Sequence, residues 1–345
     1  MPFRSGFVCI LGRPNAGKST LLNALVGEKL AIISPKPQTT RNRIQGVVHV
    51  PQRKGKNGKS EGGGQIVLVD TPGVHKPDSS LGRKMMVEVR EALEGCDLVL
   101  VIMDVTRKLD PRDQFALELL RRPKGASKTK AFLILNKVDL IREKSKLLPL
   151  IEEYRKLYDF SEVIPISALK RKGLDDLLEL AISALPAGPA YFPEDQITDQ
   201  PARFMAAEII REQVLLNTSE EIPYATTVIV DSFEEGARLT RIAATIYCER
   251  EGQKGILVGK GGSMLKKIGT SARLQIERML GTKVFLELYV KAEPGWRDSR
   301  RFVEELDWRR QLEQRMFEKR GFEHRMLDEA AEPVAPARTT TKGDS

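Results

Sequence analysis

The chain has 345 residues, which is enough for about two domains that each bury a core. Its 56 Lys and Arg residues outnumber 47 Asp and Glu residues, so the net charge is +9. Such a charge permits nucleic acid or an anionic membrane surface as a partner and does not choose between them. The longest apolar run, Leu98 to Met103, is too short to cross a bilayer.

Cysteine use and the N-terminus both favour a cytoplasmic protein. Cys9, Cys96 and Cys248 lie far apart and lack metal-ligand spacing, which predicts three reduced core thiols rather than a zinc site or a disulfide. Arg13 and Pro14 interrupt the short apolar run at the N-terminus, so no cleavable signal is predicted.

A phosphate-loop pattern follows a short apolar run, residues 7–11, that predicts a buried strand. Gly12 and Gly17 let the backbone N–H groups of the loop approach phosphate oxygens. Lys18 can reach the terminal phosphates, and the Ser19 hydroxyl can ligate Mg²⁺. Apolar residues spaced as on one helical face follow, so the loop is expected at a helix N-terminus, which favours anions. The predicted phosphate-binding residues are Gly12, Arg13, Pro14, Asn15, Ala16, Gly17, Lys18, Ser19 and Thr20.

Residues 29–43 are polar, contain two prolines and predict a long loop beside the nucleotide. Thr39 or Thr40 can complete a Mg²⁺ shell and sense a γ-phosphate, although solvated turn residues are the alternative. Strands are expected at residues 44–50 and 65–69. Between them, residues 51–64 combine glycines with four basic residues and predict a flexible hairpin excursion.

The second of these strands runs into Asp70-Thr71-Pro72-Gly73. A carboxylate at a strand end suits a Mg²⁺-organising switch, and the Gly73 N–H can meet a γ-phosphate where a side chain would block it. This turn occurs after a phosphate loop, which favours the switch over an ordinary turn.

Two later strand ends predict a guanine site. The strand at residues 130–135 leads into Asn136-Lys137-Val138-Asp139, where the Asp139 carboxylate can accept from both guanine N–H donors. Asn136 can tie the loop to the base edge, and the stem of Lys137 can pack on the ring. The second strand end leads to Ser167-Ala168-Leu169, whose backbone can meet guanine O6.

Strands alternate with helices through residue 185, which predicts an α/β fold with a mostly parallel sheet and helices on both faces. The motifs, taken in this order, resemble those of the translation-factor-type small GTPases. The loop at residues 12–19 and Gln38-Thr39-Thr40-Arg41 are similar to the Era-like branch. This resemblance implies GTP and GDP as ligands, with Mg²⁺ held by Ser19, Thr40 and Asp70, and catalytic roles for Lys18, Thr40 and Gly73.

The second half predicts an RNA-binding domain. Residues 1–187 are expected to form the GTPase domain, residues 188–201 a linker and residues 202–305 an α+β domain. Its Gly259-Lys260-Gly261-Gly262 fits the G-x-x-G loop of KH domains, and the order of elements resembles a type II KH domain. Residues 241–283 hold nine Lys or Arg against three Glu, and Lys266 and Lys267 extend the predicted RNA contact.

A GTPase of this branch followed by this KH type resembles the Era family over about residues 1–305. The resemblance implies a monomer that binds the 3′ end of 16S rRNA, assists 30S assembly and associates peripherally with the cytoplasmic face of the inner membrane. Two alternatives remain: an RNA-binding module with a degenerate nucleotide fold, and a membrane-associated GTPase that couples growth to the cell cycle, with RNA binding secondary. The charged tail, residues 306–345, is longer than the family needs and is expected to be partly disordered.

The residue after the Asp-x-x-Gly turn is Val74, which cannot orient an attacking water as a glutamine does in many small GTPases. Slow intrinsic turnover is therefore expected. Family members with the same loop use the residue matching Asn15 to hold K⁺ beside the phosphates. Asn15 has that role here or only stabilises the loop turn, and the sequence does not separate the two.

Overall fold

The computed structural model describes residues 2–36, 38–51, 53–54, 60–61, 63–74, 76–121, 129–219 and 222–308. Met1–Val303 form one compact unit and Glu304–Ser345 a second. Within the basic excursion, the described residues form two short paired strands, β3 (Arg53–Lys54) and β4 (Ser60–Glu61). Residues 52, 55–59 and 62 of that excursion and the tail after residue 308 lie outside the described residues, as do the predictions made for them.

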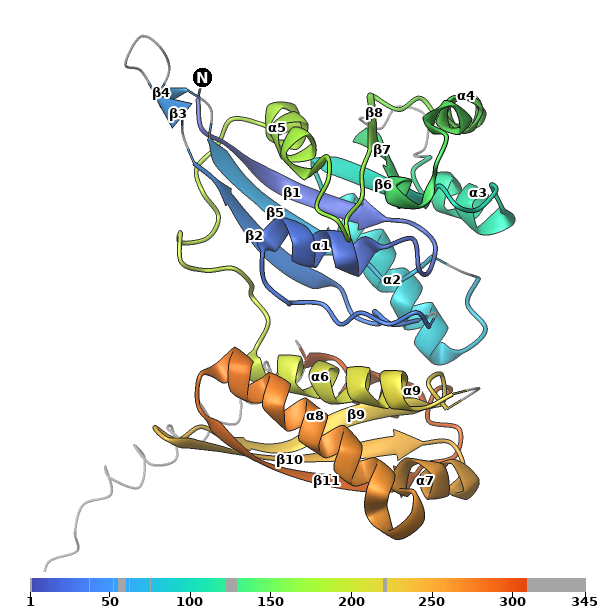
Figure 1. Ribbon diagram of the computed structural model, residues 1–345, viewed down its shortest axis with the longest axis vertical. Helices are drawn as coiled ribbons and strands as arrows, with labels where there is room; N and C mark the ends of the chain where they lie inside the picture. The colour runs from blue at the N-terminus through green and yellow to red at the C-terminus, as the bar shows by residue number, and fades with distance from the viewer. Residues whose placement is uncertain are drawn as a thin grey trace, which may run out of the picture. The chain divides into compact units, whose positions relative to one another are not determined.

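The first half forms a six-stranded sheet in the order β2-β5-β1-β6-β7-β8 (Figure 1). Only β2 runs antiparallel to its neighbour; the other pairs are parallel. The central strands are continuous apolar runs because helices cover both faces of the sheet. The strands are β1 (Arg4–Leu11), β2 (Ile44–Val50), β5 (Gly64–Asp70), β6 (Leu98–Asp104), β7 (Lys130–Asn136) and β8 (Glu162–Pro165).

Helices pack on both faces, as the sequence predicts. On one face, α2 (Ser80–Glu94), α3 (Pro111–Glu118) and α4 (Leu147–Leu157) share a core with alternate residues of β1, β6 and β7. On the other, α1 (Lys18–Val26) contacts β2 and β5, and α5 (Leu174–Ala184) contacts β1 and β5. Figure 1 shows α1 in front of the strands and α2 behind them. The predicted α/β class is confirmed, and the phosphate loop lies between β1 and α1.

The segment expected to be a linker is tied to the sheet. The side-chain oxygen of the fully buried Gln65 accepts from the N–H groups of Tyr191, at 2.7 Å, and Phe192, at 3.0 Å. Its amide nitrogen donates back to the Phe192 carbonyl at 2.7 Å. Farther along, the Val47 N–H donates to the Ile197 carbonyl at 2.8 Å. The bond to Val47 covers part of the β2 edge, which would otherwise expose unpaired backbone groups, and the Gln65 bonds tie the segment to β5.

The second half is a three-stranded sheet, order β11-β10-β9, packed against helices. The middle strand is antiparallel to β9 and parallel to β11. The helices α6 and α8 lie side by side on one face of this sheet and share its core (Figure 1). The elements are α6 (Ala202–Asn217), β9 (Thr226–Glu234), β10 (Leu239–Cys248), α7 (Glu251–Val258), η3 (Lys260–Gly262), α8 (Ser263–Leu280), β11 (Lys283–Ala292) and α9 (Arg300–Glu305).

Candidate nucleotide and nucleic-acid sites

A cavity of about 340 Å³ opens at the carboxyl ends of the parallel strands, where ligands bind in folds of this kind. It brings together the predicted phosphate loop, switch and base-site residues. Of the predicted residues, those lining it are Pro14, Asn15, Gly17, Lys18, Ser19, Thr20, Thr39, Thr40, Gly73, Asn136, Lys137, Asp139, Ser167 and Leu169. The wall also includes Gln38, which belongs to the motif similar to the Era-like branch, and five residues that were not predicted from the sequence: Ile32, Ile33, Ser34, Pro35 and Leu140.

Steric contacts explain why glycine stands at the turns of the phosphate loop. Gly17 has a φ of 103°, and a Cβ there would lie 2.3 Å from the Asn136 amide nitrogen. A Cβ at Gly12 would lie 2.5 Å from the Ile102 carbonyl oxygen. A Cβ at Gly73 would lie 2.7 Å from the ring of Pro14, so the loop and the Asp-x-x-Gly turn touch. Larger residues at these positions would push the loop out of shape.

Lys18 is held in place by the loop itself. Its ammonium group donates to the carbonyls of Gly12, at 3.1 Å, and Arg13, at 3.0 Å. Burial lowers the pKa of Lys18 to about 8, although the nearby charge of Asp70 opposes that shift. A buried ammonium of this kind is stabilised when anionic phosphate oxygens approach it.

Three oxygen-bearing side chains converge beside Lys18 as a candidate Mg²⁺ site. The Ser19 hydroxyl donates to Asp70 Oδ2 at 2.7 Å and lies 2.9 Å from the Thr40 hydroxyl. Thr40 also donates to Asp70 Oδ2 at 3.3 Å, whereas the Thr39 hydroxyl donates to the Lys36 carbonyl. The geometry therefore favours Thr40 over Thr39 in this group.

The donor set fits a hard cation. Asp70 is fully buried, and its Oδ1 has no hydrogen-bond partner among the residues that the structure describes. Burial raises the pKa of Asp70 to about 6, although Lys18 and the Ser19 and Thr40 hydroxyls act in the opposite direction. Hydroxyl and carboxylate oxygens are ligands that Mg²⁺ accepts together with water and phosphate oxygens. A cation here would satisfy the unpartnered buried oxygen.

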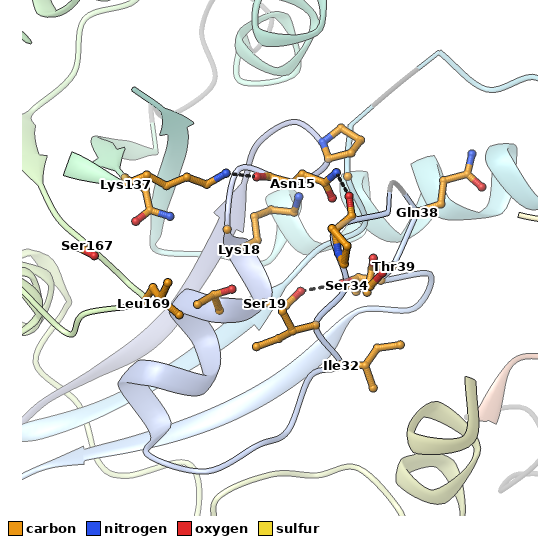
Figure 2. A pocket seen from close by; sticks show the side chains of 18 of the residues that line it. Asn15, Lys18, Ser19, Ile32, Ser34, Gln38, Thr39, Lys137, Ser167 and Leu169 are labelled. Carbon is orange, nitrogen blue, oxygen red and sulfur yellow. Dashed lines mark hydrogen bonds between the residues drawn. The ribbon is translucent and has the colours of Figure 1, made fainter. Parts of the chain in front are cut away.

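The predicted base site is tied directly to the phosphate loop. The Asn136 amide donates to the Ala16 carbonyl at 2.9 Å, and its oxygen accepts from the Ala168 N–H at 3.0 Å. Lys137 has a φ of 69°, and its ammonium donates to the Asn15 carbonyl at 2.9 Å (Figure 2). The two base-site segments, residues 136–139 and 167–169, and the phosphate loop thus form one hydrogen-bonded frame.

Asp139 lies at the open side of the pocket and is exposed, as is Leu169. The left-handed turn at Lys137 places Asp139 in a 3₁₀ turn, η1 (Val138–Leu140), at the rim. Only a bound base would desolvate this carboxylate.

One charged residue of the frame was missed from the sequence. Asp104, at the end of β6, is buried and accepts from the Lys137 ammonium at 2.7 Å. Burial acts to raise the pKa of Asp104, but the hydrogen bonds from Lys137 and Thr106 together outweigh burial. The net result is a pKa below the ordinary value of an aspartate. Its position matches that of Asp70, a carboxylate ending a buried parallel strand, and that shared pattern was an available signal.

Several predicted residues support the pocket from behind rather than lining it. Thr71, for example, is buried and donates to the Ile10 carbonyl at 2.7 Å. The Arg13 side chain points away from the cavity into an ion pair with α3. The predicted residues behind the wall are Gly12, Arg13, Ala16, Asp70, Thr71, Pro72 and Ala168.

The loop after α1 is held by α6. Glu212 is buried, accepts from the Ile33 N–H at 2.9 Å and pairs with Lys29 at 2.5 Å. Its neighbour Arg211, also buried, donates to the carbonyl of Thr39. The segment that carries Thr39 is therefore positioned by a helix of the second half, within the one compact unit.

The predicted RNA loop borders a second cavity. Gly259, Gly261 and Gly262 have positive φ values, from 59° to 80°, which favour glycine. A Cβ at Gly259 would lie 2.8 Å from the Met264 Cβ, whereas the space beside the other two is open. The exposed Lys260 forms the tip of the loop together with Gly261.

A groove of about 380 Å³ lies beside this loop. Lys266 lines it, and the exposed Lys267 follows on α8 but does not. Thr270 and Arg273, four and seven residues after Lys266, also line the groove. Spacings of four and seven residues place these side chains on one face of a helix, which is a signal present in the sequence. The full lining is Gly262, Leu265, Lys266, Gly269, Thr270, Arg273, Leu286 and Leu288.

Comparisons with known proteins agree with this geometry. Residues 7–137 match a family described as 50S ribosome-binding GTPase, and residues 221–297 match the KH domain family. GTPase Era of Geobacter metallireducens is 50% identical over 89% of this chain and 98% of its own length. GTPase Era of Ruminiclostridium cellulolyticum is 48% identical over 90% of this chain and 99% of its own length.

Solved structures give the same result. An Aquifex aeolicus Era variant bound to GDP and AlF₄⁻ has a TM-score of 0.79 and 39% identity, covering 89% of this chain and 99% of that one. Era in complex with MgGDPNP and nucleotides 1506–1542 of 16S ribosomal RNA has a TM-score of 0.80, with the same identity and coverage.

Fold and sites together define a P-loop GTPase joined to a KH domain. This chain belongs to the Era family of GTPases, since its relatives match it over nearly their whole length. The resemblance predicted from the motifs is confirmed, and the chain is a GTP-hydrolysing enzyme. Among the described residues, no helix has the length and apolarity needed to cross a membrane.

Proposed function

We propose that this protein hydrolyses GTP with bound Mg²⁺, binds the 3′ end of 16S rRNA through its KH domain and assists assembly of the 30S subunit. The observation that carries this proposal is the pairing of the nucleotide pocket with a glycine-loop groove in one compact unit. The complex of a related Era with MgGDPNP and 16S rRNA supports it. The proposed GTPase domain comprises residues 1–187 and the proposed KH domain residues 202–305, with residues 188–201 as the linker between them.

In the nucleotide pocket, Ser19, Thr40 and Asp70 would hold Mg²⁺. The cation would neutralise phosphate charge. Lys18 would leave its loop carbonyls to bind the terminal phosphates, and the Gly73 N–H would donate to the γ-phosphate. These groups stabilise charge that grows during phosphoryl transfer.

A monovalent cation is the proposed source of the polar group that Val74 cannot supply. The Asn15 amide nitrogen donates to the Pro35 carbonyl at 2.6 Å (Figure 2), which fixes the amide plane and leaves Oδ1 as its acceptor oxygen. K⁺ bound by that oxygen would neutralise transition-state charge beside the phosphates. The bond to Pro35 also supports the simpler role, in which Asn15 only stabilises the loop. The two roles are distinguished by GTP turnover, which depends on K⁺ only if Asn15 binds the cation.

RNA would bind as a single strand along the KH groove. Gly261 and Gly262 leave room for a backbone phosphate, and Lys260 adds positive charge at the loop tip. Lys266 and Arg273 on α8 would continue that charge along the groove. Because such contacts neutralise phosphates, the affinity for RNA should fall as the salt concentration rises.

A direct test uses purified protein and two RNAs of equal length, one with the 3′-terminal 16S sequence and one scrambled. We expect tighter binding of the 16S sequence and measurable GTP turnover in the same preparation. Depletion in cells should accumulate precursor 16S rRNA and free 30S particles. Equal affinity for both RNAs would contradict the proposed target.

Peripheral binding to the inner membrane is the alternative role, which the net charge of +9 permits. Sedimentation with anionic vesicles, with and without RNA, distinguishes the membrane role from the rRNA-binding role. If vesicles bind the protein while 16S RNA does not, the membrane role is favoured.

A further inference from the structure

The phosphate loop is anchored by a buried ion pair that lies outside the nucleotide pocket. One guanidinium nitrogen of Arg13 lies 3.1 Å from carboxylate oxygens of both Asp110 and Asp113. Arg13 is 4% exposed and Asp113 is fully buried. A charge buried this deeply is costly unless it is paired, so the pairing constrains where the Arg13 side chain can lie.

The two carboxylates belong to a rigid helix start. Asp110 caps α3 by accepting from the Arg112 N–H at 2.7 Å, and Asp113 accepts from the Asp110 N–H at 3.1 Å. This reciprocal pair is a capping box, which fixes the first turn of a helix. The capping box therefore fixes the positions of the two carboxylates that Arg13 contacts.

The backbone of Arg13 faces the other way, toward the reacting groups. Its carbonyl accepts from the Lys18 ammonium, and the next residue, Pro14, touches Gly73 of the switch turn. Asn15 then holds the Pro35 carbonyl. A shift of Arg13 would be transmitted to each of these contacts.

We propose that Arg13 is a positioning residue for GTP hydrolysis, acting as a brace between α3 and the first half of the phosphate loop. The brace fixes Lys18, Pro14 and Asn15 on the side of the pocket that meets the γ-phosphate. GDP lacks the γ-phosphate, so its binding rests mainly on the base site and on the loop amides near the β-phosphate, and the contacts described for the Arg13 side chain are instead with α3. Losing the brace should therefore impair turnover more than GDP affinity. This role rests on the proposed GTP hydrolysis in this pocket.

The test compares Arg13→Ala, Arg13→Lys and the double variant Arg13→Met with Asp113→Asn, which leaves no buried charge unpaired at residue 113. Arg112→Ala is the matched control, because exposed Arg112 also pairs with Asp110, at 3.6 Å. Single-turnover GTP hydrolysis, GDP Kd and Tm are measured for each. We expect turnover to fall about tenfold in Arg13→Ala and in the double variant, with GDP Kd changed less than about threefold.

Arg13→Lys should recover part of the rate, and Arg112→Ala should match wild type. The double variant should lose turnover even where its Tm equals that of wild type. Turnover that falls only with Tm, or that returns in the double variant, would overturn the brace. Wild-type turnover in Arg13→Ala would do the same. Absence of turnover in the wild type would instead refute hydrolysis in this pocket.

Discussion

At the scale of single residues, base recognition depends on one exposed carboxylate. Asp139 lies at the pocket rim, where it can accept from both guanine donors. Asp139→Asn places an amide there, which mismatches guanine and matches xanthine. Affinity for GTP should fall by several kcal/mol, because a polar pair is broken in a site that the base desolvates.

Titrations with GTP and XTP measure this exchange. XTP should bind the variant more tightly than it binds the wild type. Glu143→Gln, which removes another exposed carboxylate from the same loop region, should leave both affinities unchanged. A variant that retains GTP affinity and ignores XTP would show that Asp139 does not read the base.

The buried Asp70 should make stability depend on pH. Burial raises its pKa from 3.8 to about 6, so between these values the folded protein holds a proton that the unfolded chain has lost. Its contribution to the free energy of unfolding is therefore greatest below pH 4 and falls as pH rises to 6, by on the order of 3 kcal/mol. Asp70→Asn cannot ionise, so the variant should gain stability relative to wild type from pH 4 to pH 7.5.

Urea unfolding of nucleotide-free protein in EDTA checks this, because bound Mg²⁺ would mask the effect. Asp195→Asn, an exposed carboxylate in the segment along the sheet, is the control and should track the wild type. Parallel stability curves for wild type and Asp70→Asn would contradict the assignment.

K⁺ dependence separates the two roles of Asn15. Replacing Na⁺ by K⁺ at constant ionic strength should raise the turnover of the wild type by about tenfold if a cation stabilises the transition state. Asn15→Ala should abolish that rise while leaving GDP binding largely intact. Equal rates in Na⁺ and K⁺ would leave RNA or a protein partner as the source of the missing group.

At the scale of elements, the glycine loop between α7 and α8 should tolerate substitution structurally but not functionally. Gly261→Asp meets open space, so its stability cost is limited to the strain of a positive φ, about 1 kcal/mol. Its charge would repel the RNA backbone, so RNA affinity should fall at least about tenfold. Gly281→Asp, at another open positive-φ glycine that ends α8, is the matched control.

Filter binding with the 16S fragment and thermal unfolding distinguish these effects. Both variants should lose similar stability, and only Gly261→Asp should lose RNA affinity. Nucleotide affinity should be unchanged in both. Unaltered RNA binding by Gly261→Asp would refute the proposed KH contact.

Element boundaries followed closely from sequence where the apolar pattern was continuous. The strand predicted at residues 44–50 is β2, and the strand predicted at residues 130–135 is β7. The alternating pattern of residues 224–231 predicts a strand, which in the structure begins and ends later, as β9 (Thr226–Glu234). Its end is set by pairing with β10, whose register shifts at Ala243, and an interstrand bulge has no local sequence signal.

At the scale of the whole molecule, α6 should couple the nucleotide pocket to RNA binding. Glu212 and Arg211 hold the loop that carries Thr39, so a change in that loop must act on α6. Glu212→Gln weakens the ion pair with Lys29 without removing volume. The ratio of RNA affinities with a GTP analogue and with GDP should move toward one, by a factor of about five.

Asn217→Ala is the control, since Asn217 bonds only within α6 among the contacts of the described residues. RNA affinity is measured for each variant in both nucleotide states. If Glu212→Gln retains the wild-type ratio, the contact is structural and does not transmit the nucleotide state.

The sequence by itself determined the α/β class and the family, and it predicted most of the residues that line the nucleotide cavity. It could do so because phosphate, Mg²⁺ and guanine impose short, ordered motifs on adjacent backbone. Contacts between distant segments required the tertiary structure: Asp104 with Lys137, Arg13 with α3, and Glu212 with the loop after α1. These pairs lie 33 to 183 residues apart. The charge of a side chain does not indicate which distant residue will pair with it. The packing of the chain brings the two residues together and excludes water from between them.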